Sequence, residues 1–118
     1  MTSKKKSTRP TKDTTEQFEM LFPIVESVYN EIKELSKKKQ DGALNEMKVK
    51  LTNRVLSKVK EILKDDPTLE FLDLLDEVSL PTNSDAVMII AQFKAAMQQF
   101  RNRHYDTSSY EAVWITSD

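Results

Sequence analysis

Glycine occurs only once in this chain, at position 42, and this scarcity most limits the folds that the sequence can adopt. An all-β domain of 118 residues needs many tight turns, and such turns depend on glycine. Lysine, glutamate and leucine are plentiful instead, and all three are good helix formers. Composition therefore favours a helical fold, and the length allows one domain.

Apolar residues at helical spacing predict a first helix from about residue 14, where Thr14 and Gln17 fit a capping box. Its stripe consists of Phe18, Leu21, Val25, Val28, Ile32 and Leu35. Pro23 either kinks this helix or divides it, and we favour a kink because the stripe keeps its phase. Three lysines at 37–39 suit the helix end, and Gly42 suits a turn that folds the next helix back antiparallel.

Three further helices are predicted after that turn. The second runs from about residue 43 to 64, and the fourth runs to about His104 from a capping box of Thr82 and Asp85. The third is short, at about 67–78, with Asp66 as its N-cap, and its apolar residues cover more than half of the circumference. We therefore expect an all-α domain over residues 14–104, a small antiparallel bundle of about four helices.

The two ends of the chain should differ from the bundle. Residues 1–13 have no apolar residue after Met1 and predict a disordered basic tail. Residues 105–118 form a C-terminal arm that favours extended structure, and no partner strand is evident elsewhere. This arm is either packed against the bundle or exposed as a binding segment.

Residue types exclude several kinds of chemistry. One histidine and no cysteine cannot supply a structural zinc site, and one glycine cannot build a phosphate loop. The acids Asp65, Asp66, Glu70 and Asp73 lack the spacing of a calcium loop and suit a helix N-terminus. We expect a non-enzymatic protein with no catalytic residue, metal or cofactor. No apolar run approaches the ~20 residues of a membrane span, so we expect no membrane partner and a cytoplasmic protein.

The function favoured by the sequence is an interaction module that binds another protein or a second copy of itself. The apolar excess of the third helix predicts that Phe71 and Leu74 face outwards. Tyr110, Trp114 and Ile115 are further candidates, since aromatic side chains are enriched in binding hot spots. An equally weighted alternative is that all five pack within one core, with Trp114 as a lid.

Charge alternates along the chain in blocks that could orient a partner. Residues 13–36 are acidic, 37–64 are basic, and 65–86 hold seven acids and no base. The basic residues suggest an alternative function, association with nucleic acid through the N-terminal tail and second helix. A pI of about 5.9 weighs against it. The candidate residues for that function are Lys4, Lys5, Lys6, Arg9, Lys12, Lys50 and Arg54.

Overall fold

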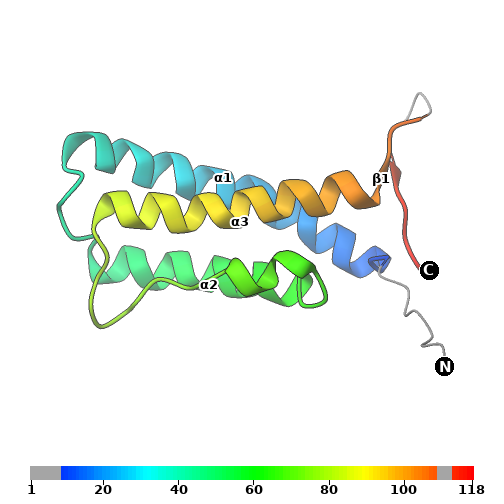
Figure 1. The fold of residues 1–118 in the computed structure, drawn as a ribbon, viewed down its shortest axis with the longest axis horizontal. Coiled ribbons are helices and arrows are strands. Elements are labelled where there is room, and N and C mark those ends of the chain that lie inside the picture. The colour runs from blue at the N-terminus through cyan, green and yellow to red at the C-terminus, as the bar shows by residue number, and fades with distance from the viewer. Residues whose placement is uncertain (1–8, 109–112) are drawn as a thin grey trace.

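The computed structural model describes residues 9–108 and 113–118, and their fold is predominantly helical (Figure 1). The described residues form three α-helices: α1 (Lys12–Lys38), α2 (Glu46–Ile62) and α3 (Asn83–His104). A short 3-10 helix, η1 (Pro67–Phe71), lies between α2 and α3. Two-residue strands β1 (Tyr105–Asp106) and β2 (Val113–Trp114) pair antiparallel after α3.

Helix α1 begins two residues earlier than the sequence predicts. Thr11 is its N-cap, and the Thr11 hydroxyl accepts a hydrogen bond of 3.1 Å from the Thr14 amide. The predicted capping box at Thr14 and Gln17 is therefore wrong, because Thr14 already lies in the first turn. The helix continues through Pro23 to Lys38 as one element, which excludes a division at the proline.

The turn between α1 and α2 makes α1 and α2 an antiparallel hairpin, as predicted, but Gly42 has a different role there. Its φ angle does not lie in the left-handed region, so it is not a left-handed helix cap. A Cβ atom at Gly42 would lie 3.3 Å from the Cβ of Lys39 and 3.5 Å from the Nδ2 of Asn83. Only the contact with Lys39, inside the turn, is closer than ordinary packing, and the Asn83 amide donates to the Gly42 carbonyl at 2.8 Å.

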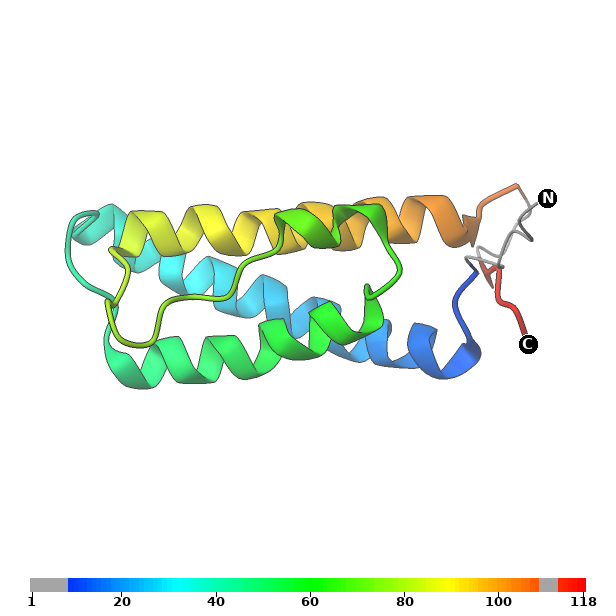
Figure 2. The same ribbon diagram turned by 60° about the horizontal axis from the view of Figure 1, so that its bottom comes forward.

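The predicted third helix is wrong. Only Pro67–Phe71 are helical, as η1, and residues 72–82, which we call the strap, run extended back along the bundle (Figure 2). The strap brings the chain from the end of α2 to the start of α3, so α2 and α3 run in the same direction and α1 runs opposite (Figures 1 and 2). Eleven extended residues span up to ~36 Å, enough to return along the ~25 Å of a 17-residue helix.

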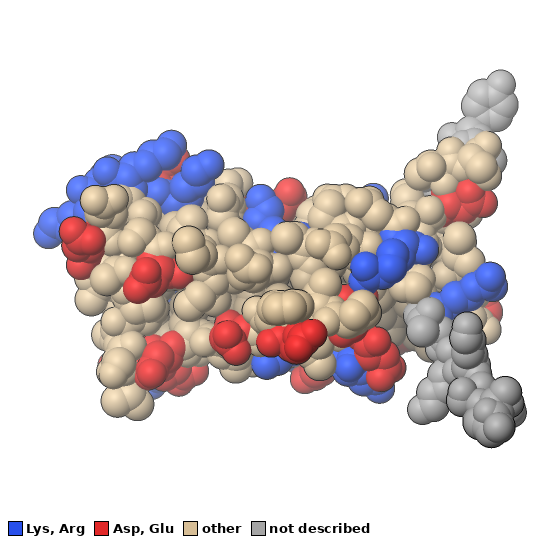
Figure 3. Space-filling model, in the orientation of Figure 1, with Lys and Arg blue, Asp and Glu red and all other residues tan. Residues whose placement is uncertain are grey.

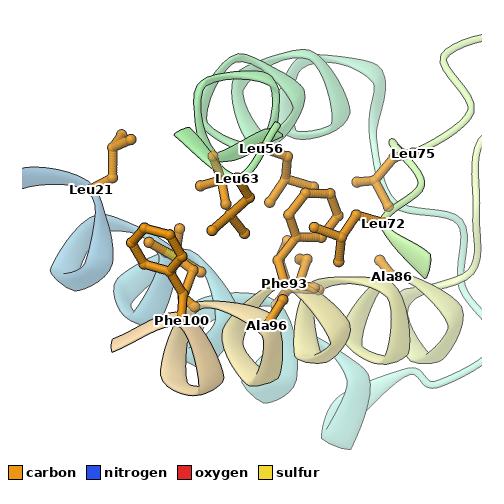
Figure 4. Close-up of a cluster of buried hydrophobic side chains, with 14 of the residues drawn as sticks. Leu21, Leu56, Leu63, Leu72, Leu75, Ala86, Phe93, Ala96 and Phe100 are labelled. Atoms are coloured by element: carbon orange, nitrogen blue, oxygen red, sulfur yellow. The ribbon is translucent and has the colours of Figure 1, made fainter. Parts of the chain in front are cut away.

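One hydrophobic core joins the three helices and the strap (Figure 4). Phe93 of α3 is fully buried at its centre, and Leu56 of α2 points towards it. Leu72 and Leu75 reach the same core from the strap. The strap thus fills the place on the bundle that a fourth helix would otherwise cover.

The C-terminal arm pairs with itself, because both strands lie within the predicted residues 105–118. Tyr105 pairs with Trp114, and Asp106 pairs with Val113, so the arm folds back on the residues that directly follow α3. The Ser117 amide donates to the carbonyl of Pro10 at 2.9 Å, which joins the arm to the residues before α1. The tail predicted over residues 1–13 falls largely outside the described residues.

Candidate interaction surface

The strap is held to α2 by one buried side chain, Asn53. Its amide nitrogen donates to the Leu75 carbonyl at 2.9 Å and to an Oε of Glu77 at 3.0 Å. Its amide oxygen accepts from the Leu75 amide at 2.9 Å. Asn53 therefore satisfies both backbone groups of Leu75 as a neighbouring strand would, and this pairing fixes which strap residues face inwards.

A second anchor holds the beginning of η1 against α3. The Asp66 carboxylate caps η1 by accepting from the Thr68 amide at 3.0 Å, and it also pairs with Arg103 of α3. Burial raises the pKa of this carboxyl, but the hydrogen bonds from Thr68 and the charge of Arg103 outweigh burial and hold the pKa below its usual value. The ion pair fixes where η1 leaves the bundle.

Between these anchors, and directly after Leu75, the chain presents apolar side chains to solvent. Phe71 is 63% exposed, Leu74 is 39% exposed and Val78 is 92% exposed, whereas Leu72 and Leu75 are buried. The structure thus places both predicted residues, Phe71 and Leu74, on the outside. Leu74 is exposed by the extended course of the strap, whereas Phe71 is the last residue of η1.

The exposed apolar residues of η1 and the strap are surrounded by carboxylates. Residues 65–78 contain six acids and no base, and acidic side chains gather along the course of the strap in Figure 3. One of them, Asp76, accepts from the Val78 and Ser79 amides at 2.8 Å each. Those two backbone hydrogen bonds lower the pKa of Asp76 and shape the turn that carries Val78 outwards. We call Phe71, Leu74 and Val78, with the acids of residues 65–78, the strap surface.

The predicted C-terminal residues are placed differently from Phe71 and Leu74. Trp114 is half-buried, with its ring centroid 5.0 Å from that of Phe18, and its indole donates to Glu19 at 2.8 Å. The Ile115 amide donates to the carbonyl of His104 at 2.7 Å, and the Ile115 side chain is also half-buried. Tyr110 lies outside the described residues. Trp114 and Ile115 therefore join the arm to the end of the bundle, and a binding role for them stays a prediction.

The basic candidate residues do not form one continuous patch in the described part of the chain. Lys50 pairs with Glu46 one turn away at 3.2 Å, and Arg54 lies further along α2 with no ion pair to any described residue. Arg9 and Lys12 lie beside the first turn of α1, where the Lys12 amide binds Asp118. Lys4, Lys5 and Lys6 lie outside the described residues.

The side of the bundle away from the strap carries an apolar groove between α1 and α2. Its cavity has a volume of about 470 Å³. Apolar side chains of both helices line it: Leu21, Val28, Ile32, Leu51 and Val55. Lys48 of α2 crosses one end of the groove to pair with Glu31 of α1 at 3.2 Å.

His104 lies at the end of α3 in a wider, polar cleft of about 1140 Å³, beside the Asp66–Arg103 pair. Burial lowers its pKa, the nearby charges of Arg103 and Arg9 lower it further, and Asp66 acts in the opposite direction. Its ring packs edge-on against Phe100 at 4.8 Å. These contacts place it at the edge of the core.

The anchors Asn53 and Arg103 were not identified from the sequence. Asn53 could have been suspected of a structural role, because asparagine in the interior of an amphipathic helix is a poor helix former and commonly forms hydrogen bonds to backbone groups. Nothing in the sequence indicated a partner for Arg103, because arginine near the C-terminal end of a helix is favourable without any partner.

Within residues 9–108 and 113–118 no group of three or more His, Asp or Glu side chains is arranged to hold a metal ion. No described helix is long and apolar enough to cross a membrane. No family model, no curated protein and no solved structure matches this chain.

Proposed function

We propose that this protein is a non-enzymatic interaction module of the cytoplasm, and that its strap surface binds another protein. The observation that carries the proposal is the exposure of Phe71, Leu74 and Val78 within eight residues of one ordered, anchored segment. Grouped apolar side chains on a soluble protein commonly mark a contact surface.

The anchors make the strap surface suitable for binding. Asn53 fixes the backbone at Leu75, and the Asp66–Arg103 pair fixes the start of η1. Phe71 and Leu74 lie between these two anchors, so the backbone that carries them is already ordered before a partner arrives. Preorganisation of this kind reduces the entropy lost on association.

The charge of the strap surface indicates the chemistry of the partner. Six acids and no base over residues 65–78 give it a negative potential around an apolar centre. A complementary partner carries an apolar pocket with lysine or arginine at its rim. We expect association with such a partner to slow as salt concentration rises, because exposed charges are screened.

The test compares two single substitutions in tagged full-length protein used to recover partners from a lysate of its native cells. Phe71→Ser removes the largest exposed side chain of the strap surface, and Met88→Ser removes a similarly exposed side chain (67%) on α3. We expect Met88→Ser to recover the same partner as the natural chain and Phe71→Ser to lose it, with equal helical circular dichroism for both. Equal recovery by the two variants would contradict the proposal.

The nucleic-acid alternative predicts a different outcome in the same experiment. Nuclease treatment of a parallel sample should leave the recovered protein partner unchanged if the strap surface is the contact. Loss of all partners after nuclease, together with weaker recovery by a chain lacking residues 1–8, would favour the basic residues instead.

A further inference from the structure

The α1–α2 groove is an apolar face with no partner among the described residues. Leu51 of α2 is 49% exposed and Ile24 of α1 is 41% exposed, and Met20 and Met47 extend the apolar surface along the two helices. Leu51 lies two residues from the strap anchor Asn53, which is about 200° around the helix. The groove and the strap surface therefore lie on different sides of α2, and one does not cover the other.

The two helices that border the groove carry opposite charge. In α1 the acids outnumber the bases by six to four, and in α2 the bases outnumber the acids by five to two. The Lys48–Glu31 pair shows that residues of opposite charge already meet across the groove, and it sets the register of the two antiparallel helices. Counting along both helices from this pair places Ile24 level with Val55, and Val28 level with Leu51.

We propose that a second copy of this chain covers the groove, forming a symmetric dimer through the α1–α2 faces. The two-fold axis runs parallel to the helices, so that α1 of each copy packs against α2 of the other. The four helices then form an antiparallel bundle with Ile24, Val28, Leu51 and Val55 of both copies at its centre. This inference goes beyond the proposed function, because it uses a different surface.

Charge complementarity argues for a second copy in this arrangement. Rotation about an axis parallel to the helices brings the acidic α1 of one copy against the basic α2 of the other at both contacts. A perpendicular axis would bring α1 against α1 and α2 against α2, with like charges facing. Of the charged residues that line the groove, the acid Glu31 lies on α1, and the bases lie on α2 (Lys48, Arg54 and Lys58), so this axis brings the acid of each copy against the basic helix of the other.

The size of the face indicates the strength of the dimer. A 17-residue helix is ~25 Å long, and two helices at normal packing distance are ~20 Å wide, giving on the order of 500 Å² for each copy. That area lies near the lower end of specific interfaces. We therefore expect a reversible dimer that forms at micromolar concentrations and dissociates on dilution.

The test measures the dissociation constant of the dimer by sedimentation velocity of the full-length chain between about 1 μM and 1 mM. Two variants are compared with the natural chain, one with a charged residue inside the groove and one with a charged residue outside it. Leu51→Glu places a carboxylate in the groove, and Met88→Glu makes an equivalent change at a residue of α3 that does not line it. We expect the natural chain and Met88→Glu to dimerise alike, and Leu51→Glu to raise the dissociation constant at least tenfold. Ile24→Glu, on the other helix, should repeat the effect of Leu51→Glu.

A mixing experiment tests the charge contacts. Glu31→Lys and Lys48→Glu should each weaken the dimer, because each chain alone presents like charges at these positions. Mixed together, the two variants regain opposite charges between copies and should dimerise more tightly than either alone. The proposal is overturned if the natural chain stays monomeric to 1 mM, or if Leu51→Glu and Met88→Glu have equal effects. It is also overturned if mixing the two charge variants does not strengthen association. Binding of a helix from another protein in the groove would not rescue it.

Discussion

The helices and the strap are stabilised in different ways. Each α-helix contributes at least five buried residues spread along its length, so that no single contact determines its position. The strap contributes two buried leucines, and its backbone is fixed by Asn53 at Leu75 and by the Leu44 amide, which donates to the Pro81 carbonyl at 2.8 Å. The Asp66–Arg103 pair fixes the chain before it. Residues 71–78, which have fewer buried side chains than any of the α-helices, therefore present the apolar side chains that we assign to binding, and their order depends on a few contacts.

The largest expected difference in stability is between substitutions of two strap residues, Leu72 and Leu74. Leu72→Ala opens a cavity in the core and should reduce the free energy of unfolding by about 2–4 kcal/mol. Leu74→Ala removes a side chain that is already partly exposed and should cost less than about 1 kcal/mol. Urea denaturation of both variants measures their free energies of unfolding. Equal losses of stability would contradict the placement of Leu72 in the core and Leu74 at the surface.

Removal of the Asn53 anchor should have the next largest effect. Asn53→Ala leaves the buried amide and carbonyl of Leu75 without partners, at a cost of about 2–3 kcal/mol. Asn102→Ala is the matched control, since Asn102 is exposed and its side chain accepts an exposed hydrogen bond from Gln98, so the change in stability should be less than about 0.5 kcal/mol. If the two asparagine variants unfold at the same urea concentration, Asn53 does not hold the strap.

Acid should weaken the other anchor. The pKa of Asp66 is lower in the folded chain, so its contribution is present at neutral pH and is lost as pH falls below 3.8 towards the folded value. The pKa of His104 is also lowered, so unfolding takes up a proton and stability falls as pH drops below 6.5. Thermal melts should show a melting temperature that begins to decline as pH falls below about 6.5. His104→Gln should remove the part of this decline that lies between about pH 6.5 and the acid range in which Asp66 titrates. Asp66→Asn should cost about 1–2 kcal/mol at pH 7, and the cost should shrink as pH falls below 3.8.

Exposed ion pairs on the helices should have the smallest effect. Lys50→Ala breaks a pair with Glu46 in which both side chains are more than half exposed. We expect a change of about 0.3–0.5 kcal/mol, reduced further at 1 M salt. A loss comparable to that of Asn53→Ala would mean that charge on α2, rather than the strap anchor, determines stability on this side of the bundle.

The helices could be predicted from the sequence because apolar spacing, caps and the terminal lysines all indicate the same structure. The Thr82 cap of α3 is an example, since its hydroxyl accepts from the Asp85 amide as expected. The strap could not be predicted, because Asp66 and Pro67 start a helix correctly and the apolar run that follows suits a helix as well as a strand. Its extended course depends on Asn53, which lies 22 residues before Leu75 in the chain and has no local signal that links the two.

Phe71 and Leu74 were expected at the surface because residues 67–78 contain more apolar side chains than one core contact can bury. Their observed exposure agrees with this expectation. The groove was not predicted, because Leu51 and Val55 read as core positions on a helix packed between neighbours. They line a groove because no described segment packs against this side of α1 and α2, and Leu51 is 49% exposed there.

The most direct measurement of the strap is backbone nuclear magnetic resonance of the full-length chain, with hydrogen exchange at each amide. We expect extended-type Cα chemical shifts over residues 72–76, and we expect the amide of Leu75 to exchange far more slowly than that of Leu74. Helical shifts continuing from Pro67 through Val78, or rapid exchange at Leu75, would contradict the anchored strap and the outward surface that depends on it.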